Sequence, residues 1–374
     1  MILCPCPTKG TPVPESVDLA IIGPVPPPHG GVAVHVERFL PFLDAAGIRW
    51  KLYNPSGPTS ESPRIVSVAR GRALWFARYL LTGSEQTIHL HASHWTAWAA
   101  IAWWSQVRGK RVVLSVHSAV SRVFRGSALR RRLASRGLRC ASAIIAVNED
   151  IRTELLACGV DPALIHVVEP FIPPPWGVPG EGVSAEAVEF CARHSPVLLA
   201  TGGAVLDEGV DVYGMDMALD LVERLREIHP RIGLLWYLLR PLHRDRVHEA
   251  QFLERTKGEP LQHHVHVEPA KGPMYNAYKL VDGVIRPTST DGDPLTVREA
   301  HAAGVPTLVS DVCPRPGESV VFSSRDLDAF EQGLESLLLS AEQIRERLQG
   351  LPVSEAPETL IEILQSVLIE PNGN

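Results

Sequence analysis

The residues best suited to chemistry stand in a polar stretch, residues 286–294, between an apolar strand and an apolar helix. An anion could bind the unpaired backbone N–H groups at the start of this helix, near Leu295 and Thr296. Glu299, about one turn further along, could accept hydrogen bonds from ribose hydroxyls, and Asp291 lies in the loop where a sugar would hang. The alternative is a capped helix start with no ligand-binding role, but a cap alone does not explain why so many polar residues stand between the apolar strand and the apolar helix.

A second candidate loop follows the first expected strand, residues 17–22. There Gly30 and Gly31 precede a helix, so backbone N–H groups could approach an anion closely. The loop lacks the GxGxxG pattern of dinucleotide-binding proteins, because the prolines of residues 24–28 occupy the turn. A ligand loop and a plain turn both remain open.

Histidines end two further strands of the first half. His117 closes an apolar strand and could donate a hydrogen bond to a sugar hydroxyl or a phosphate, or it could be purely structural. His89, His91 and His94 gather around the end of the preceding strand. Metal ligation there is conceivable, but no acidic partner stands at a recognisable spacing, and we expect no metal.

A local run of arginines without any acid covers residues 122–139. Apolar residues interleave with the charges, which indicates a short basic amphipathic helix. It is either a solvated face or a patch for anionic lipid or a polyprenyl-diphosphate-linked acceptor; nucleic acid is disfavoured. The arginines are Arg122, Arg125, Arg130, Arg131, Arg132, Arg136 and Arg139.

The elements that must position these residues alternate between short apolar strands and amphipathic helices, which predicts an α/β protein with parallel sheets covered on both faces. A proline- and glycine-rich stretch interrupts the pattern, which then restarts. We expect two doubly wound, Rossmann-like halves with ligands between them at the carboxyl ends of the strands. The expected parts are a loose tail (1–16), an N-terminal acceptor domain (17–172), a linker (173–194), a C-terminal nucleotide-sugar domain (195–340) and C-terminal helices (341–374), the last packing back on the first domain.

Composition limits the possible functions. The 374 residues include 36 Lys and Arg against 42 Asp and Glu, a net charge of −6, which argues against general binding to nucleic acid. The six cysteines show no zinc-finger spacing and indicate reduced thiols. Neither a secretion signal nor a membrane-spanning run is apparent. We expect a cytoplasmic protein, with association with the inner face of the membrane left open.

The polar stretch and its surroundings resemble the large family four of bacterial retaining glycosyltransferases, which have the GT-B fold. Residues 286–300, which include the polar stretch, read RPTSTDGDPLTVREA, and residues 304–312 read GVPTLVSDV. Asp291 and Glu299 have the spacing of the family's Glu-x7-Glu motif. Weaker matches stand in the right order along the chain. They are PPPHGG ending at Gly31, VLSVH ending at His117, AIIAV ending at Val147, and VEPFI ending at Ile172.

The resemblance implies a nucleotide-diphosphate sugar as donor substrate, without a cofactor or a bound metal. Glu299 would bind the ribose, and Gly30 and Gly31 would close over the sugar. His117, Asp291 and Glu299 would form the catalytic group, with retention of configuration. Further donor contacts would come from Arg286, Gly292, Asp293, Pro294, Leu295 and Thr296.

Two departures from the family pattern stand out. The usual Arg and Lys after the first strand of the second domain are missing, so Arg286 or Arg240 would have to supply positive charge to the diphosphate. The first acidic position is Asp291 rather than Glu, one methylene shorter.

The expected function is transfer of a hexose-type sugar to a hydroxyl of a glycan or lipid-linked acceptor in surface polysaccharide synthesis. The missing cations favour the alternative, a catalytically degenerate GT-B protein that binds a nucleotide or glycan as a partner subunit. A nucleotide-sugar epimerase would need acid–base residues for which no signature is visible. Donor identity, acceptor and oligomeric state stay open.

Overall fold

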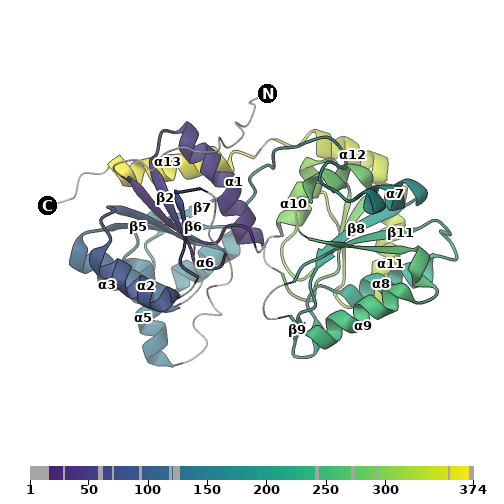
Figure 1. The fold of residues 1–374 in the computed structure, drawn as a ribbon, viewed down its shortest axis with the longest axis horizontal. Coiled ribbons are helices and arrows are strands. Elements are labelled where there is room, and N and C mark those ends of the chain that lie inside the picture. Colours follow the sequence, from purple (N-terminus) through teal and green to yellow (C-terminus); the bar gives the residue numbers. More distant parts are fainter. Residues whose placement is uncertain are drawn as a thin grey trace. The chain divides into compact units, whose positions relative to one another are not determined.

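The structure is a computed structural model that describes residues 17–27, 30–57, 62–69, 71–91, 95–117, 120, 127–240, 244–270, 274–291, 294–352 and 354–369. The chain divides into two compact units. Unit 1 extends to Ile172 and takes up the chain again from Ser354, and unit 2 begins at Pro173. Each unit is built on one parallel sheet (Figure 1).

The sheet of unit 1 has the strand order β3-β2-β1-β4-β5-β6-β7, and every neighbouring pair is parallel. The residues of its central strands are almost all buried, as expected where helices cover both faces. The strands are β1 (Leu19–Ile22), β2 (Trp50–Asn54), β3 (Ile65–Ser67), β4 (Thr87–His91), β5 (Arg111–Val116), β6 (Ala143–Ala146) and β7 (Ile165–Val167).

Two groups of helices cover the two faces of this sheet. Helices α2 (Arg72–Thr82), α3 (Trp95–Arg108), α5 (Ala128–Arg139) and α6 (Glu149–Ala157) contribute to one apolar core. Helices α1 (Gly31–Ala45) and α13 (Ala356–Ile369) contribute to the other. The last helix of the chain therefore packs with α1 in unit 1, and a short 3-10 turn, η1 (Pro162–Leu164), leads into β7.

The sheet of unit 2 has the order β12-β11-β8-β13-β14-β15, again parallel throughout. Its strands are β8 (Val197–Gly202), β11 (Gly233–Leu238), β12 (Val265–Pro269), β13 (Gly283–Arg286), β14 (Thr307–Ser310) and β15 (Val320–Phe322). A small antiparallel hairpin, β9 (Leu206–Asp207) and β10 (Val210–Asp211), follows β8.

Helices also cover both faces of the second sheet. One core contains residues of α8 (Met215–Leu225), α9 (Arg246–Lys257) and α11 (Leu327–Leu339). The other contains residues of α7 (Ala185–Arg193), η3 (Tyr275–Leu280) and α10 (Leu295–Ala302). The remaining elements are η2 (Leu261–His263) and α12 (Ala341–Gln349).

The expected linker, 173–194, contains a regular element. Helix α7 begins where the Ser184 hydroxyl accepts a hydrogen bond from the N–H of Ala187, and it buries Phe190 and Cys191. The stretch is therefore not a plain connector, because these apolar side chains join a core of unit 2.

The two sheets share one topology, which is the strand order of doubly wound dinucleotide-binding folds. The order reverses between β1 and β4 in unit 1 and between β8 and β13 in unit 2. Ligands of such sheets bind beside the carboxyl ends of the strands at this switch point. Within the described residues, no helix has the length and apolar character needed to cross a bilayer.

Candidate functional site

In unit 1, three histidines from different elements meet at the switch point. His35 lies in the second turn of α1, His91 ends β4, and His117 directly follows β5. One ring nitrogen from each lies within 4.8 Å of the others. The rings of His91 and His117 are stacked at a centroid distance of 5.3 Å, and the ring of His35 stands edge-on to His117 at 5.1 Å.

Hydrogen bonds hold these rings in place. His35 donates from Nδ1 to the carbonyl of Pro170 at 2.8 Å, because a carbonyl can only accept. Nδ1 of His91 and Nε2 of His117 lie 3.0 Å apart. His89 packs beside His91 at a centroid distance of 4.1 Å, and its Nε2 contacts the Ser115 hydroxyl at 2.8 Å.

The buried environment keeps these imidazoles neutral. Burial lowers the pKa of His35 to about 4 and that of His89 to about 3. Burial, reinforced by the neighbouring imidazoles, also holds the pKa values of His91 and His117 well below 6.5. At neutral pH all four rings can both donate and accept hydrogen bonds.

Sequence reasoning identified only part of this group. It pointed to His117, His89 and His91, but His94 lies outside the described residues. It missed His35, which stands among Val36, Phe39 and Leu40 on the buried face of α1. A histidine within an apolar helical stripe was the available signal.

The glycines expected to close over a ligand lie at the start of α1. Gly30 is its N-cap, with an extended backbone (φ −148°), and Gly31 is its first residue. A side chain at Gly30 would meet no atom within 4 Å, so no close packing requires glycine at this position. Their contact with a donor stays a prediction.

In unit 2, the carboxyl end of β13 holds a buried network of charges. Arg286 donates from Nε to Asp291 Oδ2 at 2.9 Å, and Arg315 donates from Nη1 to the same oxygen at 3.2 Å. Both side chains of the Arg315–Asp291 pair are buried, at 2% and 11% exposure. Arg286 also reaches the carbonyl of Thr201 at the end of β8, across the switch point.

This network fixes the ionisation of its members. Burial opposes charging of Asp291, but the charges and hydrogen bonds of Arg286 and Arg315 lower its pKa to about 2. Burial likewise opposes the charge of Arg286, and Asp291 more than offsets it, so the pKa of Arg286 is raised. The carboxylate is ionised at every physiological pH.

The network changes which residues are candidates to replace the Arg and Lys that are absent after β8. Arg240, one of the two sequence candidates, pairs with Glu249 at 2.8 Å on α9. Arg286 lies at the switch point as expected, but it is joined there by Arg315, which sequence reasoning missed. The signal was an arginine between Pro314 and Pro316, shortly after β14.

The other sequence-predicted donor residues lie around the start of α10. Pro294 is the N-cap and has no side chain that could cap the helix, and Leu295 and Thr296 open the first turn as expected. Glu299 is 5% exposed and accepts a hydrogen bond of 2.8 Å from the Tyr278 hydroxyl. Gly292 and Asp293 lie outside the described residues.

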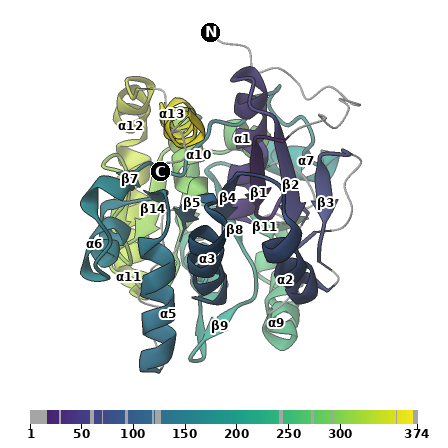
Figure 2. The ribbon, with the colours of Figure 1, turned by 90° about the vertical axis from the view of Figure 1, so that its left-hand side faces the viewer.

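Residues 128–139 of the arginine run form a helix, as the sequence predicted. Helix α5 lies beside α3 (Figure 2). The two helices pack closely: a side chain added at Gly137 would fall 1.9 Å from the Trp98 carbonyl oxygen. Leu129 on α5 and Val107 on α3 are exposed at 67% and 60%. Arg131, Arg132, Arg136 and Arg139 are exposed and Arg130 is half-buried, whereas Arg122 and Arg125 lie outside the described residues.

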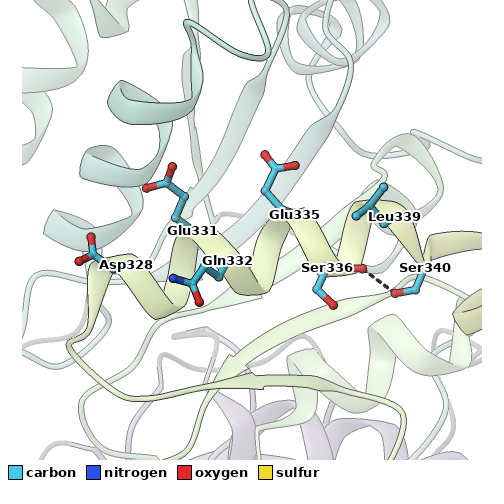
Figure 3. A pocket seen from close by; sticks show the side chains of 7 residues that line it. All are labelled: Asp328, Glu331, Gln332, Glu335, Ser336, Leu339 and Ser340. Carbon is cyan, nitrogen blue, oxygen red and sulfur yellow. Dashed lines mark hydrogen bonds between the residues drawn. The ribbon is translucent and has the colours of Figure 1, made fainter.

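A hollow of about 720 Å³ lies along α11, and none of its lining residues belongs to the arginine network (Figure 3). Its walls are side chains of that helix and the Ser340 that ends it. Glu331 pairs with Arg224 and Glu335 with His229, so these carboxylates already have partners. The hollow is an open helix surface rather than a reaction site.

Comparison with known proteins supports a relationship to glycosyltransferases. Residues 29–174 match the family model described as Glycosyltransferase Family 4, which confirms the resemblance noted in the sequence. None of the curated proteins matches the chain.

Solved structures show the same fold at low identity. HepE from Anabaena in complex with UDP-glucose is 13% identical, with a TM-score of 0.70 over 93% of this chain and 99% of its own. Sucrose-phosphate synthase from Thermosynechococcus elongatus is 18% identical, with a TM-score of 0.68 over 94% and 99%. WaaG, a glycosyltransferase involved in lipopolysaccharide biosynthesis, is 15% identical, with a TM-score of 0.64 over 92% and 99%. These likenesses establish the GT-B fold.

Proposed function

This chain is a relative of the family-four glycosyltransferases with the GT-B fold, and we propose that it transfers a hexose-type sugar from a nucleoside-diphosphate donor to a hydroxyl group, with retention of configuration. The observation that supports this most is the buried pair of arginines around Asp291, in the loop that leads into α10. HepE and its UDP-glucose make uridine nucleotides the first donors to test.

In this proposal the diphosphate lies by the start of α10. The N–H groups of Leu295 and Thr296 and the positive end of the helix face the developing anion, and the two arginines supply the charge that the family places elsewhere. Glu299, held by Tyr278, accepts hydrogen bonds from the ribose. Asp291 acts mainly by fixing Arg286 and Arg315, because both of its oxygens already contact arginine.

The reaction breaks the bond between the anomeric carbon and the diphosphate and forms one to the acceptor oxygen. The bond's electron pair leaves with the diphosphate, and a phosphate oxygen takes the acceptor's proton, so no separate protein base is required. Stabilisation of the diphosphate by amides and cations needs no metal at that position. His117 would contact a sugar hydroxyl from unit 1.

The acceptor is proposed to be a glycan or a lipid-linked saccharide of surface polysaccharide synthesis. The basic helix α5, with Leu129 exposed beside its arginines, would meet the anionic inner face of the membrane or a polyprenyl diphosphate. The protein would then act in the cytoplasm at that surface.

A second candidate function rests on the missing Arg and Lys after β8. Gly202 to Gly209 contains no cation, so the chain could bind a nucleotide or glycan as a non-catalytic partner subunit. Binding without turnover would distinguish this candidate from the transferase.

Thermal shift with a panel of nucleotides and nucleotide sugars tests the donor, because a ligand that binds only the folded state raises the melting temperature. We expect UDP or another nucleoside diphosphate to stabilise the wild type and Glu346→Gln, an exposed control on α12, but not Glu299→Gln. Sugar transfer that survives in Glu299→Ala would contradict the role of Glu299. Stabilisation without transfer or donor hydrolysis would favour the partner-subunit candidate.

A further inference from the structure

The histidine group of unit 1 has a geometry that hydrogen bonding to a sugar does not require. Three imidazoles converge from three separate elements, and one nitrogen of each lies within 4.8 Å of the others. We propose that His35, His91 and His117 form a site for a single transition-metal cation such as Zn²⁺, with Nε2 of His35, Nδ1 of His91 and Nε2 of His117 as ligands.

The orientation of His35 fits this role. Its Nδ1–H is donated to the Pro170 carbonyl, which leaves the lone pair of Nε2 available. Histidine ligands of metals usually donate their other N–H to a carbonyl or carboxylate in this manner, which fixes the tautomer and the ring plane. The contact links α1 to the chain after β7, so the ring is fixed by the fold.

The spacing of the other two ligands fits as well. Two nitrogens about 2.0–2.1 Å from a tetrahedral zinc are about 3.3 Å apart, and Nδ1 of His91 lies 3.0 Å from Nε2 of His117. Without a cation this contact is an N–H···N hydrogen bond. With a cation, each ring carries its hydrogen on the opposite nitrogen and both lone pairs face the metal.

The scaffold behind these ligands is a paired and closely packed part of the sheet. Strands β4 and β5 are paired so that His91 lies opposite Ser115, two residues before His117. At Gly23, after β1, an added side chain would come within 3.0 Å of His91 Cβ, so the adjoining strand packs tightly against this ligand.

The ligand type selects the metal. Three imidazoles and no carboxylate suit Zn²⁺, Cu²⁺, Ni²⁺ or Co²⁺, whereas Mg²⁺ and Ca²⁺ prefer oxygen ligands. Three protein nitrogens leave a fourth tetrahedral position for water or an oxygen of a bound molecule. This site does not depend on the diphosphate contacts proposed in unit 2, but it includes His117. With a cation bound, the sugar hydroxyl proposed to contact His117 would reach the fourth position of the cation instead.

Cobalt binding tests the site without any activity measurement. The full chain, stripped of metal with a chelator, is titrated with Co²⁺, and the visible d–d absorption and the bound cobalt are measured. We expect one equivalent with the intense absorption of four-coordinate Co²⁺, displaced by Zn²⁺ but not by Mg²⁺.

Variants assign the ligands. His117→Gln and His35→Gln should each weaken Co²⁺ binding by more than about 100-fold, beyond the ~10–100-fold cost of losing only a ligand's hydrogen-bond partner. His166→Gln, on β7 of the same unit, should bind as the wild type does. Circular dichroism shows whether each variant folds, and the half-buried position of His117 makes its variant the safest.

Three results would overturn the proposal. These are wild-type protein that takes up no cobalt, cobalt bound without the four-coordinate spectrum, and a folded His117→Gln variant that binds as the wild type does. Equal loss in His166→Gln would also count against it, because that residue is not in the group.

Discussion

At the reversal of strand order, unit 1 holds His35, His91 and His117, whereas unit 2 holds Arg286, Asp291 and Arg315. The order of the first six strands of the sheet is the same in the two units, so it does not dictate the chemistry at this position. In unit 1 the imidazoles are neutral, so hydrogen bonds between the rings can be replaced by bonds to a ligand. In unit 2 two cations and one carboxylate depend on one another, because an unpaired buried charge is costly.

The largest effect is expected where the charged network is broken. Asp291→Asn leaves Arg286 and Arg315 buried without their carboxylate and should lower the free energy of unfolding by about 3–5 kcal/mol. Urea unfolding measures this, with Asp207→Asn, an exposed position of unit 2, as the control. A loss below about 1 kcal/mol would mean that the network contributes little to stability.

Acid should act on unit 2 through a buried imidazole before it reaches the network. Burial lowers the pKa of His301 to about 4, below the 6.5 of an unfolded histidine. Between these values the unfolded state binds more protons, so stability falls as pH falls from 6.5 to 4, by at most about 3 kcal/mol. Asp291, with a pKa of about 2, stays ionised over this range and loses its contribution only below about 3.8.

Unfolding measured at several pH values checks this order. His301→Gln should lose less stability than the wild type between pH 6.5 and 4, and the exposed His263→Gln should not differ from it. If both variants follow the wild-type curve, the acid sensitivity arises elsewhere in the chain.

Tight packing at the two switch points gives a graded comparison. Gly214 has a φ of +67°, and a side chain there would fall 2.1 Å from the Pro287 carbonyl oxygen, so Gly214→Ala should cost about 2–3 kcal/mol. Gly23→Ala approaches His91 Cβ at 3.0 Å and should cost about 1 kcal/mol. At Gly258, where the nearest atom is 3.8 Å away, alanine should change stability by less than about 0.5 kcal/mol.

Differential scanning calorimetry of the three variants gives the ranking. Equal melting temperatures for Gly214→Ala and Gly258→Ala would show that the loop after the hairpin relaxes freely. The comparison between the switch points would then rest on the charged network alone.

The smallest effect on stability is expected at the basic helix. Arg131→Gln with Arg132→Gln should change the free energy of unfolding by less than about 0.5 kcal/mol, because both side chains are exposed. Flotation with anionic vesicles should nevertheless weaken by about 5-fold for each charge removed, since each cation near such a surface contributes about 1 kcal/mol. The matched double variant Arg193→Gln with Arg246→Gln, on exposed positions of unit 2, should bind the vesicles as the wild type does. If the wild type floats equally with and without anionic lipid, the membrane proposal is contradicted.

Local sequence patterns predicted much of the fold. Strand β1 and the start of α10 lie where an apolar run and proline placed them, since both signals act within a few residues. Helices α7 and α9 were missed, because the first follows a proline- and glycine-rich stretch and the second is rich in polar residues. Their few apolar side chains can be recognised as core residues only in the folded structure, where they pack against the sheet.

By itself, the sequence determined the alternation of strands and helices, the doubly wound class and the position of Glu299 one turn into α10. Only the tertiary structure decided that His35 meets His117 and that Arg315 meets Asp291. Hydrophobic periodicity reports which face of an element is buried, but it carries no information on which distant polar residues share that burial. Sheet order and helix packing supply that information, because they bring separate strand ends to one edge.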